Sequence, residues 1–312
     1  MKKRKDKHYR KRRRKWLWIT LSIVLLAGIG VSVYLFTIYN NVKSTVDNEI
    51  HETVTGIDHE ATKKKVEEEE PINVLLLGVD ERENDKGRSD TMIVMTLDPA
   101  KERMQMVSIP RDTRTEIVGR DMDDKINHAY AFGGSDMSVN TVENFLDIEL
   151  DYYLRMNMEG LGQLVDAVGG ITVENEFAFD YGGKSFSEGE IELNGEEALA
   201  WVRMRYDDPE GDAGRNERQR QVIQGVIDQG ANINAVNKIG NIMDVLGNNV
   251  ATNMKFEDMR NLATNYRASR KDVSSYQMSG NGTTIDNIYY LQVPESEVEK
   301  TNEMIREYSS SS

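Results

Sequence analysis

Short apolar runs separated by charged or turn residues dominate the chain between residues 72 and 112. The runs are Ile72–Val79, Thr91–Leu97 and Met104–Ile109, and each is rich in Val, Ile, Leu and Met. Runs of this length are typical of strands buried on both faces, although their period alone also allows a helix. We therefore predict three neighbouring strands of one sheet.

Helical periodicity alternates with strand-like runs in the rest of the chain. The predicted helices are Asp124–Phe132, Ser138–Leu146, Met158–Val168 (stopped by Gly169 and Gly170), one opened by an Asn194/Glu197 capping box, Gly214–Gly230, Lys255–Arg267 and Glu295–Tyr308. The predicted strands are Asp151–Asn157, Ile171–Val173, Val273–Met278 and Ile288–Val293, and residues 175–190 are expected to form a long loop. Interleaved strands and helices indicate an α/β fold, a three-layer α/β/α sandwich around a central mixed sheet.

One apolar segment is longer than all the others. Trp16 to Tyr39 is 24 residues without a charge, about 36 Å of helix against ~30 Å of hydrocarbon. Trp and Tyr lie near both ends, as interfacial aromatics do, and the Lys and Arg before it predict a cytoplasmic N-terminus. A cleaved signal peptide would have a shorter apolar region, and a core helix would not follow eleven positive charges. We predict a basic cytoplasmic tail (1–15) and one transmembrane helix (16–39).

Residues 40–71 are polar and include the charge run KKKVEEEE. This composition favours an extracellular stalk, partly helical, that lifts the domain off the membrane. The folded extracellular domain is then expected to span residues 72–308.

The charge of the chain is unevenly distributed. Residues 1–15 carry a net charge of +10, so the remaining residues carry −24 against a total of −14. An acidic body argues against nucleic acid as a partner, because nucleic-acid binding needs a basic footprint. The chain has no cysteine, which excludes disulfides and cysteine-ligated metals.

Charged residues stand at the ends of the three predicted strands. Asp80 follows the first, Arg88 and Asp90 precede the second, and Arg111 and Asp112 follow the third. Ligands gather at strand ends in open α/β sheets, so two carboxylates and two arginines there can hold a metal ion and a phosphate together. The alternative interpretation is a set of solvated loop charges.

A second cluster of basic residues lies in the stretch WVRMRYDDPEGDAGRNERQR. Arg203 and Arg205 share a face only on extended chain, so the helix from Asn194 has to unwind near Trp201 if both bind one ligand. Arg215, Arg218 and Gln219 are three and four residues apart near a helix N-terminus, which favours an anion site. A salt-bridged surface helix is the alternative.

Other catalytic arrangements find little support. Of the four histidines, three (8, 51 and 59) fall in the predicted tail or stalk and only His128 in the domain. A zinc site or a Ser/His/Asp triad is therefore not expected. Neither a Walker loop nor a GxGxxG motif occurs.

One membrane helix is followed, in order, by the motifs LLLGVD, GRSDTM, SIPRDT, KINHAYAFGG, LVDAVGGI, LNGEEALAWVRMR and GRNERQRQ. With this series of motifs the chain resembles the LytR–CpsA–Psr family, most closely its wall teichoic acid ligases of bacilli. The resemblance covers roughly residues 70–230. It implies a phosphotransferase that moves an anionic glycopolymer from a polyprenyl-pyrophosphate carrier to peptidoglycan, as a phosphodiester to the 6-hydroxyl of N-acetylmuramic acid.

By position, the resemblance implies that Asp80 and Asp90 bind Mg²⁺ (or Mn²⁺). It also implies that Asp80, Asp90 and Arg111 are the catalytic residues. The implied pyrophosphate contacts are Arg88, Arg111, Arg203, Arg205, Arg215, Arg218 and Gln219. An implied polyprenyl pocket has Phe132, Phe145, Leu161, Leu164 and Val168 as candidates, each of which also suits ordinary core. A base for the acceptor is open, with Asp80 and Asp112 as candidates. Two rival functions stay open: a pyrophosphatase on polyprenyl-pyrophosphate substrates, and a non-catalytic surface protein that binds lipid-linked polymer.

Overall fold

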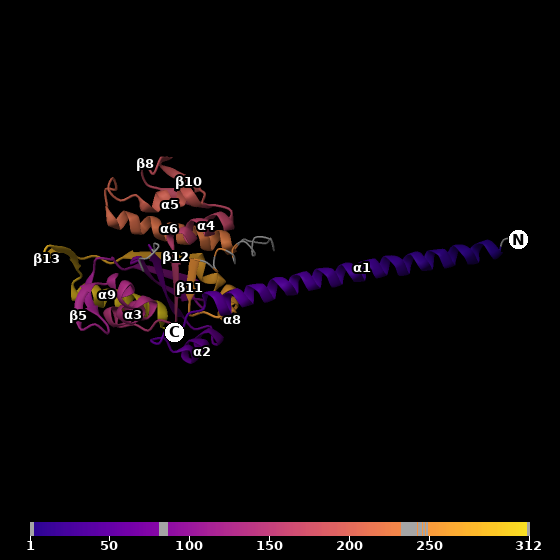
Figure 1. Ribbon diagram of the computed structural model, residues 1–312, viewed down its shortest axis with the longest axis horizontal. Helices are drawn as coiled ribbons and strands as arrows, with labels where there is room; N and C mark the ends of the chain where they lie inside the picture. Colours follow the sequence, from indigo (N-terminus) through magenta and orange to yellow (C-terminus); the bar gives the residue numbers. More distant parts are fainter. Residues whose placement is uncertain are drawn as a thin grey trace. The chain divides into compact units, whose positions relative to one another are not determined.

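The computed structural model describes residues 3–80, 87–231 and 249–310, together with Ile242, Val245 and Gly247 (Figure 1). The chain divides into two compact units, Met1–Thr45 and Val46–Ser312.

The first unit is one long helix, α1 (Lys3–Thr45). Within the described residues it contains the one segment that is long and apolar enough to cross a membrane. Its apolar side chains are exposed, among them Trp16, Leu26 and Phe36. An exposed apolar surface of this kind needs a lipid environment, so α1 is compatible with a single-pass membrane anchor.

A mixed six-stranded sheet forms the centre of the second unit, in the order β11-β6-β1-β2-β3-β12. The strands are β1 (Ile72–Val79), β2 (Ser89–Asp98), β3 (Arg103–Ser108), β6 (Tyr152–Asn157), β11 (Val250–Thr252) and β12 (Asp272–Gln277). β1, β3, β6 and β12 run in one direction, and β2 and β11 run in the other. The ends of β1 and β3 and the start of β2 therefore meet at one edge of the sheet.

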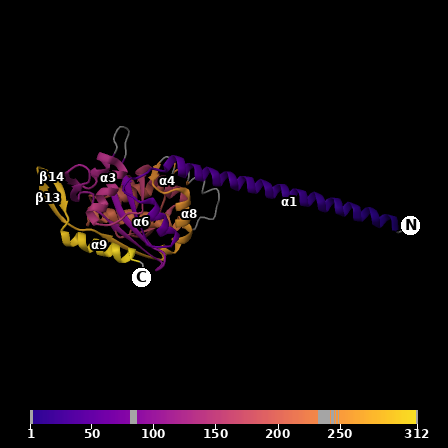
Figure 2. The same ribbon diagram turned by 90° about the horizontal axis from the view of Figure 1, so that it is seen from below.

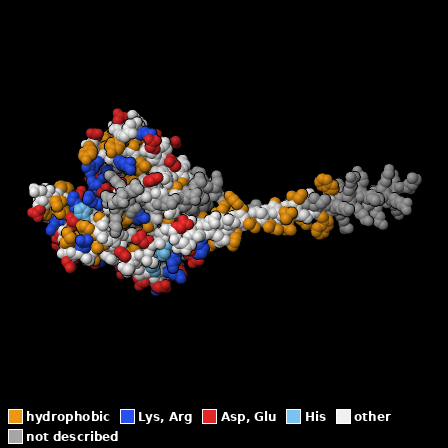
Figure 3. Space-filling model, in the orientation of Figure 1, with side chains coloured by type: hydrophobic (Ala, Val, Ile, Leu, Met, Phe, Trp, Pro, Cys, Tyr) orange, Lys and Arg blue, Asp and Glu red, His pale blue; other side chains and the backbone are white. Residues whose placement is uncertain are grey.

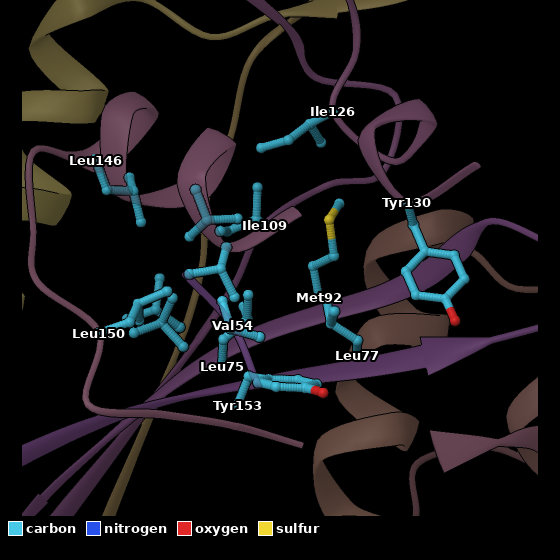
Figure 4. Close-up of a cluster of buried hydrophobic side chains, with 14 of the residues drawn as sticks. Val54, Leu75, Leu77, Met92, Ile109, Ile126, Tyr130, Leu146, Leu150 and Tyr153 are labelled. Atoms are coloured by element: carbon cyan, nitrogen blue, oxygen red, sulfur yellow. The ribbon is translucent and has the colours of Figure 1, made fainter. Parts of the chain in front are cut away.

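Helices cover both faces of this sheet (Figures 1 and 2). On one face, Leu75 and Leu77 belong to a buried cluster that includes residues of α3 (His128–Leu146) and α9 (Glu295–Ser309). Figure 4 shows part of this cluster, with Tyr130 and Leu146 of α3. On the other face lie α4 (Met158–Val168), α5 (Gly195–Arg203), α6 (Asp212–Ala231) and α8 (Phe256–Asn265). The three-layer α/β/α prediction is confirmed. Alternate residues of β1 serve opposite layers because strand side chains alternate between faces.

The predicted stalk is wrong from Val46 onward. A short π-helical turn (Val46–Ile50) and α2 (His59–Glu67) belong to the folded unit. Five apolar side chains of this segment are buried: Val46, Ile50, Val54, Ile57 and Val66. These apolar residues stand singly among charged residues. Neither the helical nor the strand period of apolar positions therefore reveals that they are buried. The boundary predicted at residue 72 thus lies within the folded unit.

Two short segments form strands where the sequence predicted other structure. The predicted helix start at Asp124 is wrong, because β4 (Arg114–Ile117) and β5 (Met122–Lys125) form a hairpin and the helix begins at His128. Within the predicted loop 175–190, β8 (Phe179–Tyr181) and β9 (Lys184–Phe186) pair around two glycines with positive φ. These hairpins depend on pairing, which single short runs do not encode.

Two further hairpins flank the helices. β7 (Ile171–Asn175) pairs with β10 (Gly189–Leu193), which leads into α5. β13 (Asn281–Ile285) pairs with β14 (Ile288–Gln292), and Leu291 of β14 donates its N–H to the Asp112 carbonyl at 2.8 Å. The second hairpin is thereby attached to the edge of the sheet where the predicted site residues lie.

Candidate functional site

A polar cavity of about 350 Å³ opens at the edge where β1 and β3 end and β2 begins. Its lining residues are Asp80, Gly87, Arg88, Asp90, Arg111, Asp112, Lys125, Asn127 and His128. The five charged residues that the sequence places at the strand ends, Asp80, Arg88, Asp90, Arg111 and Asp112, thus line one cavity.

Arg111 and Asp90 form the central ion pair of the cavity. Arg111 Nη1 donates to Asp90 Oδ1 at 2.9 Å, from the Pro110–Arg111 turn after β3 to the start of β2. Burial opposes the charge on Arg111, yet the carboxylates of Asp90, Asp212 and Asp112 outweigh burial and raise the pKa of its guanidinium. Arg111 is therefore a permanent cation fixed in the cavity wall.

The start of α6 brings a second group of charges to the same place. Arg215 Nη2 lies 2.9 Å from Asp212 Oδ1, and Arg205 Nη1 lies 4.0 Å from the same oxygen. Burial, together with the nearby cations Arg111 and Arg205, lowers the pKa of Arg215 despite Asp212 and Asp90. Cations from the segment after β3, from α6 and from the segment before α6 therefore repel one another across a short distance. In Figure 3, Lys and Arg side chains gather at the left side of the folded unit, beside a histidine.

Side chains at the strand ends and on α6 carry buried polar atoms without a hydrogen-bond partner in the described part of the chain. The donors are Nε of Arg111 and Nε and Nη2 of Arg215, and the acceptors are Oδ1 of Asp212 and Oε1 of Gln219. A buried donor left unpaired costs about 1–3 kcal/mol. An anionic ligand with several oxygen acceptors would satisfy the guanidinium donors and relieve the repulsion between the two arginines.

Arg218 has a different role from the predicted ligand contact. Its guanidinium donates to Asp208 Oδ2 at 2.6 Å, to the Trp201 carbonyl at 2.9 Å and to the Met204 carbonyl at 2.5 Å. These bonds use three of its five N–H donors inside the protein. Arg218 therefore holds the chain segment that follows α5, where Arg203 and Arg205 stand.

Replacing Arg218 with Met is expected to lower the free energy of unfolding by roughly 3 kcal/mol, because Asp208 is left buried without its partner. Urea denaturation measures this change. Normal stability combined with weakened binding of a pyrophosphate-carrying ligand would instead return Arg218 to the ligand site.

Arg203 stands in the last turn of α5 and is exposed. The chain after it is extended at Met204, so the helix ends between Arg203 and Arg205, close to the predicted unwinding at Trp201. Arg205 reaches the Asp212 cluster, whereas no ion pair ties Arg203 to it among the described residues.

Sequence reasoning assigned no site role to Lys125, Asn127 or His128, which also line the cavity. Lys125 Nζ lies 2.6 Å from Asp112 Oδ1, and His128 Nδ1 lies 2.8 Å from Asp124 Oδ2. All three belong to the KINHAYAFGG motif, which was the available signal. Their approach to the strand ends depends on the β4–β5 hairpin, which was not predicted.

An apolar cavity of about 270 Å³ lies between the sheet and helices α4 and α6. Of the five predicted pocket residues, Leu161 and Leu164 line it. Val168 and Phe145 pack in the hydrophobic core, and Phe132 contacts the His128 ring. Asp90 and Thr91, consecutive residues of β2, line the polar and the apolar cavity respectively. Both cavities therefore border the start of β2.

The chemistry of the lining suits a hard cation. Asp80 and Asp90 face one cavity, and Mg²⁺ commonly takes one or two carboxylates and completes its shell with water and substrate phosphates. No group of three acidic or His side chains among the described residues forms a full metal site. The two aspartates therefore fit a cation that is shared with a phosphate ligand.

The LytR_cpsA_psr family model matches residues 33–307. This chain belongs to that family. The match extends well beyond the motifs at residues 70–230 and includes the segment from Val46 that packs into the folded unit.

Curated relatives and solved structures agree with this membership. The polyisoprenyl-teichoic acid–peptidoglycan teichoic acid transferase TagU of Bacillus subtilis (strain 168) is 47% identical over 279 residues, 89% of this chain and 91% of that protein. The crystal structure of B. subtilis TagU matches with a TM-score of 0.64 and 46% identity, over 78% of this chain and 98% of that one. A solved structure described as TagT bound to LI-WTA matches with a TM-score of 0.66 and 29% identity, over 78% and 92%.

Proposed function

We propose that this protein is a polyisoprenyl-teichoic acid–peptidoglycan teichoic acid transferase. It takes an anionic glycopolymer from a polyprenyl-pyrophosphate carrier and joins it to peptidoglycan, as a phosphodiester to the 6-hydroxyl of N-acetylmuramic acid. Relatives at 47–48% identity that carry this name over most of the chain support the reaction class.

The observation that carries the proposal is the pairing of two cavities. The polar cavity holds cations with unpartnered buried donors, and the apolar cavity begins at the neighbouring residue of β2. A polyprenyl pyrophosphate has the complementary structure, with adjacent phosphates on a long apolar chain. Arginine forks suit phosphate oxygens because they donate in pairs.

The arginines act on the charge that develops during transfer. As the acceptor hydroxyl attacks in line, negative charge spreads over the non-bridging oxygens of the attacked phosphate. Arg111 and Arg215, held in place by Asp90 and Asp212, supply preorganised positive charge to these oxygens. Asp80 and Asp90 would hold Mg²⁺ or Mn²⁺, which neutralises phosphate charge when bound.

The reaction takes place outside the cell in this proposal. The helix α1 anchors the chain in the membrane, and the eleven Lys and Arg of residues 1–15 hold the N-terminus in the cytoplasm. The folded unit then binds the lipid carrier at the extracellular surface of the cell membrane. The peptidoglycan acceptor lies on the same side of the membrane.

Filling the apolar cavity is expected to weaken use of the long-chain donor. Leu164→Trp on α4 fills a part of the cavity that would hold about two methylenes of the polyprenyl chain. Because burial of each methylene contributes ~0.8 kcal/mol to binding, KM for a long polyprenyl donor should rise roughly tenfold. The same variant with a donor on a short, water-soluble chain is the matched control and should keep its KM. An equal loss with both donors would remove the apolar cavity from donor binding.

One reconstitution tests the proposal against its rivals. The purified unit Val46–Ser312 receives lipid-linked polymer and peptidoglycan fragments with Mg²⁺. Polymer covalently joined to the fragments supports the transferase. Free phosphate or hydrolysed donor without ligation identifies a pyrophosphatase, and retention of unchanged donor identifies a binding protein.

A further inference from the structure

His128 lines the polar cavity but takes no part in the anion-binding argument. It is the first residue of α3, and its Nδ1 lies 2.8 Å from Asp124 Oδ2. Asp124 Oδ1 in turn accepts the Lys125 backbone N–H at 2.8 Å and the Tyr290 hydroxyl at 3.3 Å. Burial opposes the charge on Asp124, but the hydrogen bonds from His128 and Lys125 outweigh it and lower the pKa of Asp124.

These bonds fix the ring of His128. An anionic Asp124 accepts from Nδ1, so Nδ1 carries the hydrogen and Nε2 keeps its lone pair in the neutral ring. Nε2 has no hydrogen-bond partner among the described residues. The ring also contacts Phe132 edge-on with centroids 5.9 Å apart, and the Arg120 guanidinium covers Phe132 at 4.2 Å.

Two other candidate bases in the cavity are engaged by cations, and Asp80 is assigned to the metal ion in the proposed function. Asp90 accepts from Arg111 at 2.9 Å, and Asp112 pairs with Lys125 at 2.6 Å and faces Arg111 Nε at 3.8 Å. A carboxylate that pairs with a fixed cation is a weaker proton acceptor than a free one. His128 combines an available lone pair with a position held by a second side chain, which is the arrangement of an oriented base.

We propose that His128 accepts the proton of the incoming acceptor hydroxyl, and that Asp124 is the positioning residue that orients it. This inference rests on the proposed transferase function and extends it to the identity of the base.

The step conserves atoms and charge. The hydroxyl oxygen forms a bond to the phosphorus that carries the polymer, and its proton passes to Nε2 of His128. The bond between that phosphorus and the bridging oxygen breaks, and polyprenyl phosphate leaves with the electron pair. The imidazolium then returns the proton to water.

The surroundings of His128 define what a pH profile would report. Its charged and titratable neighbours are Asp124 and Lys125 of β5, Tyr290 of β14, and Asp112 and Arg111 of the segment after β3. The pH profile of transfer by the native protein, compared with the profiles of variants without the imidazole, therefore isolates the contribution of His128.

The test uses the full chain in detergent with lipid-linked polymer, peptidoglycan fragments and Mg²⁺. His128→Ala and His128→Gln are expected to lower kcat roughly 10²- to 10⁴-fold with unchanged donor binding and melting temperature, since the base acts on the acceptor. Asp124→Asn should cost about 10- to 100-fold, as loss of an orienting partner does. Added imidazole should restore part of the activity of His128→Ala.

His59→Gln on α2, outside the cavity, is the matched control and should transfer normally. Native kcat in both His128 variants would overturn the inference, as would a loss of donor binding and melting temperature that matches the loss of rate. Failure of the native protein itself to ligate polymer is a different result, which overturns the proposed transferase and this inference with it.

Discussion

Arg111→Ala is expected to slow polymer transfer by 10²- to 10³-fold, about 2.7–4 kcal/mol of transition-state stabilisation. Arg111 is a fixed cation in the wall of the polar cavity, paired with Asp90 at 2.9 Å, and its Nε is buried without a hydrogen-bond partner in the described structure. Its removal takes a preorganised donor from the phosphate oxygens and leaves Asp90 uncompensated. Steady-state transfer from lipid-linked donor measures the loss.

Two companion variants sharpen this result. Arg111→Lys keeps the charge without the planar fork and should recover only part of the rate. Arg306→Ala is the matched control. Arg306 lies on α9, outside the cavity, and forms an exposed ion pair with Asp147. Near-native turnover by Arg111→Ala would remove Arg111 from the site.

Truncation at the predicted domain boundary is expected to destabilise the folded unit severely. A chain that starts at residue 72 lacks the buried side chains of Val46, Ile50, Val54, Ile57 and Val66. At about 1.5–3 kcal/mol each, their loss exceeds ~7 kcal/mol, comparable with the whole stability of a typical domain.

The same truncation removes Lys65, whose Nζ lies 2.9 Å from Asp151 Oδ1. Burial raises the pKa of Asp151 even with Lys65 beside it, and without that partner the buried carboxylate is further destabilised. The control chain 46–312 keeps every one of these contacts and should unfold cooperatively in urea. Equal urea midpoints for 46–312 and 72–312 would show that residues 46–71 contribute nothing to stability.

Continuous apolar runs were predictable from the sequence. Ile72–Val79 and Met158–Val168 form a strand and a helix over the predicted residues, and the Asn194/Glu197 capping box makes both of its hydrogen bonds. In these segments local preference and tertiary burial agree, which is why local pattern suffices.

Segments stabilised by distant partners were not predictable. His51 bridges to Thr252, and Asn73 donates its N–H to Asp151 Oδ2 at 2.8 Å, so the register of these segments depends on residues far along the chain. The β4–β5 hairpin depends on pairing of two short polar strands. No local period encodes such contacts.

The candidate site divides in the same way. Charges at strand ends were predictable, because strand ends at one edge of a sheet converge. Arg215 and Arg218 have the same local setting on α6, three residues apart, and spacing could not separate them. The difference is tertiary: Arg218 donates to Asp208 and to two backbone carbonyls, whereas Nε of Arg215 has no hydrogen-bond partner among the described residues.

The central claim is that separate segments bring guanidinium groups and two aspartates onto one diphosphate. A crystal structure of residues 46–312 with a polyprenyl pyrophosphate-linked sugar tests it most directly. We predict phosphate oxygens within hydrogen-bond distance of Arg111 and Arg215, and the polyprenyl chain between α4 and α6. A diphosphate bound elsewhere, with both arginines still facing only Asp90 and Asp212, would contradict the account.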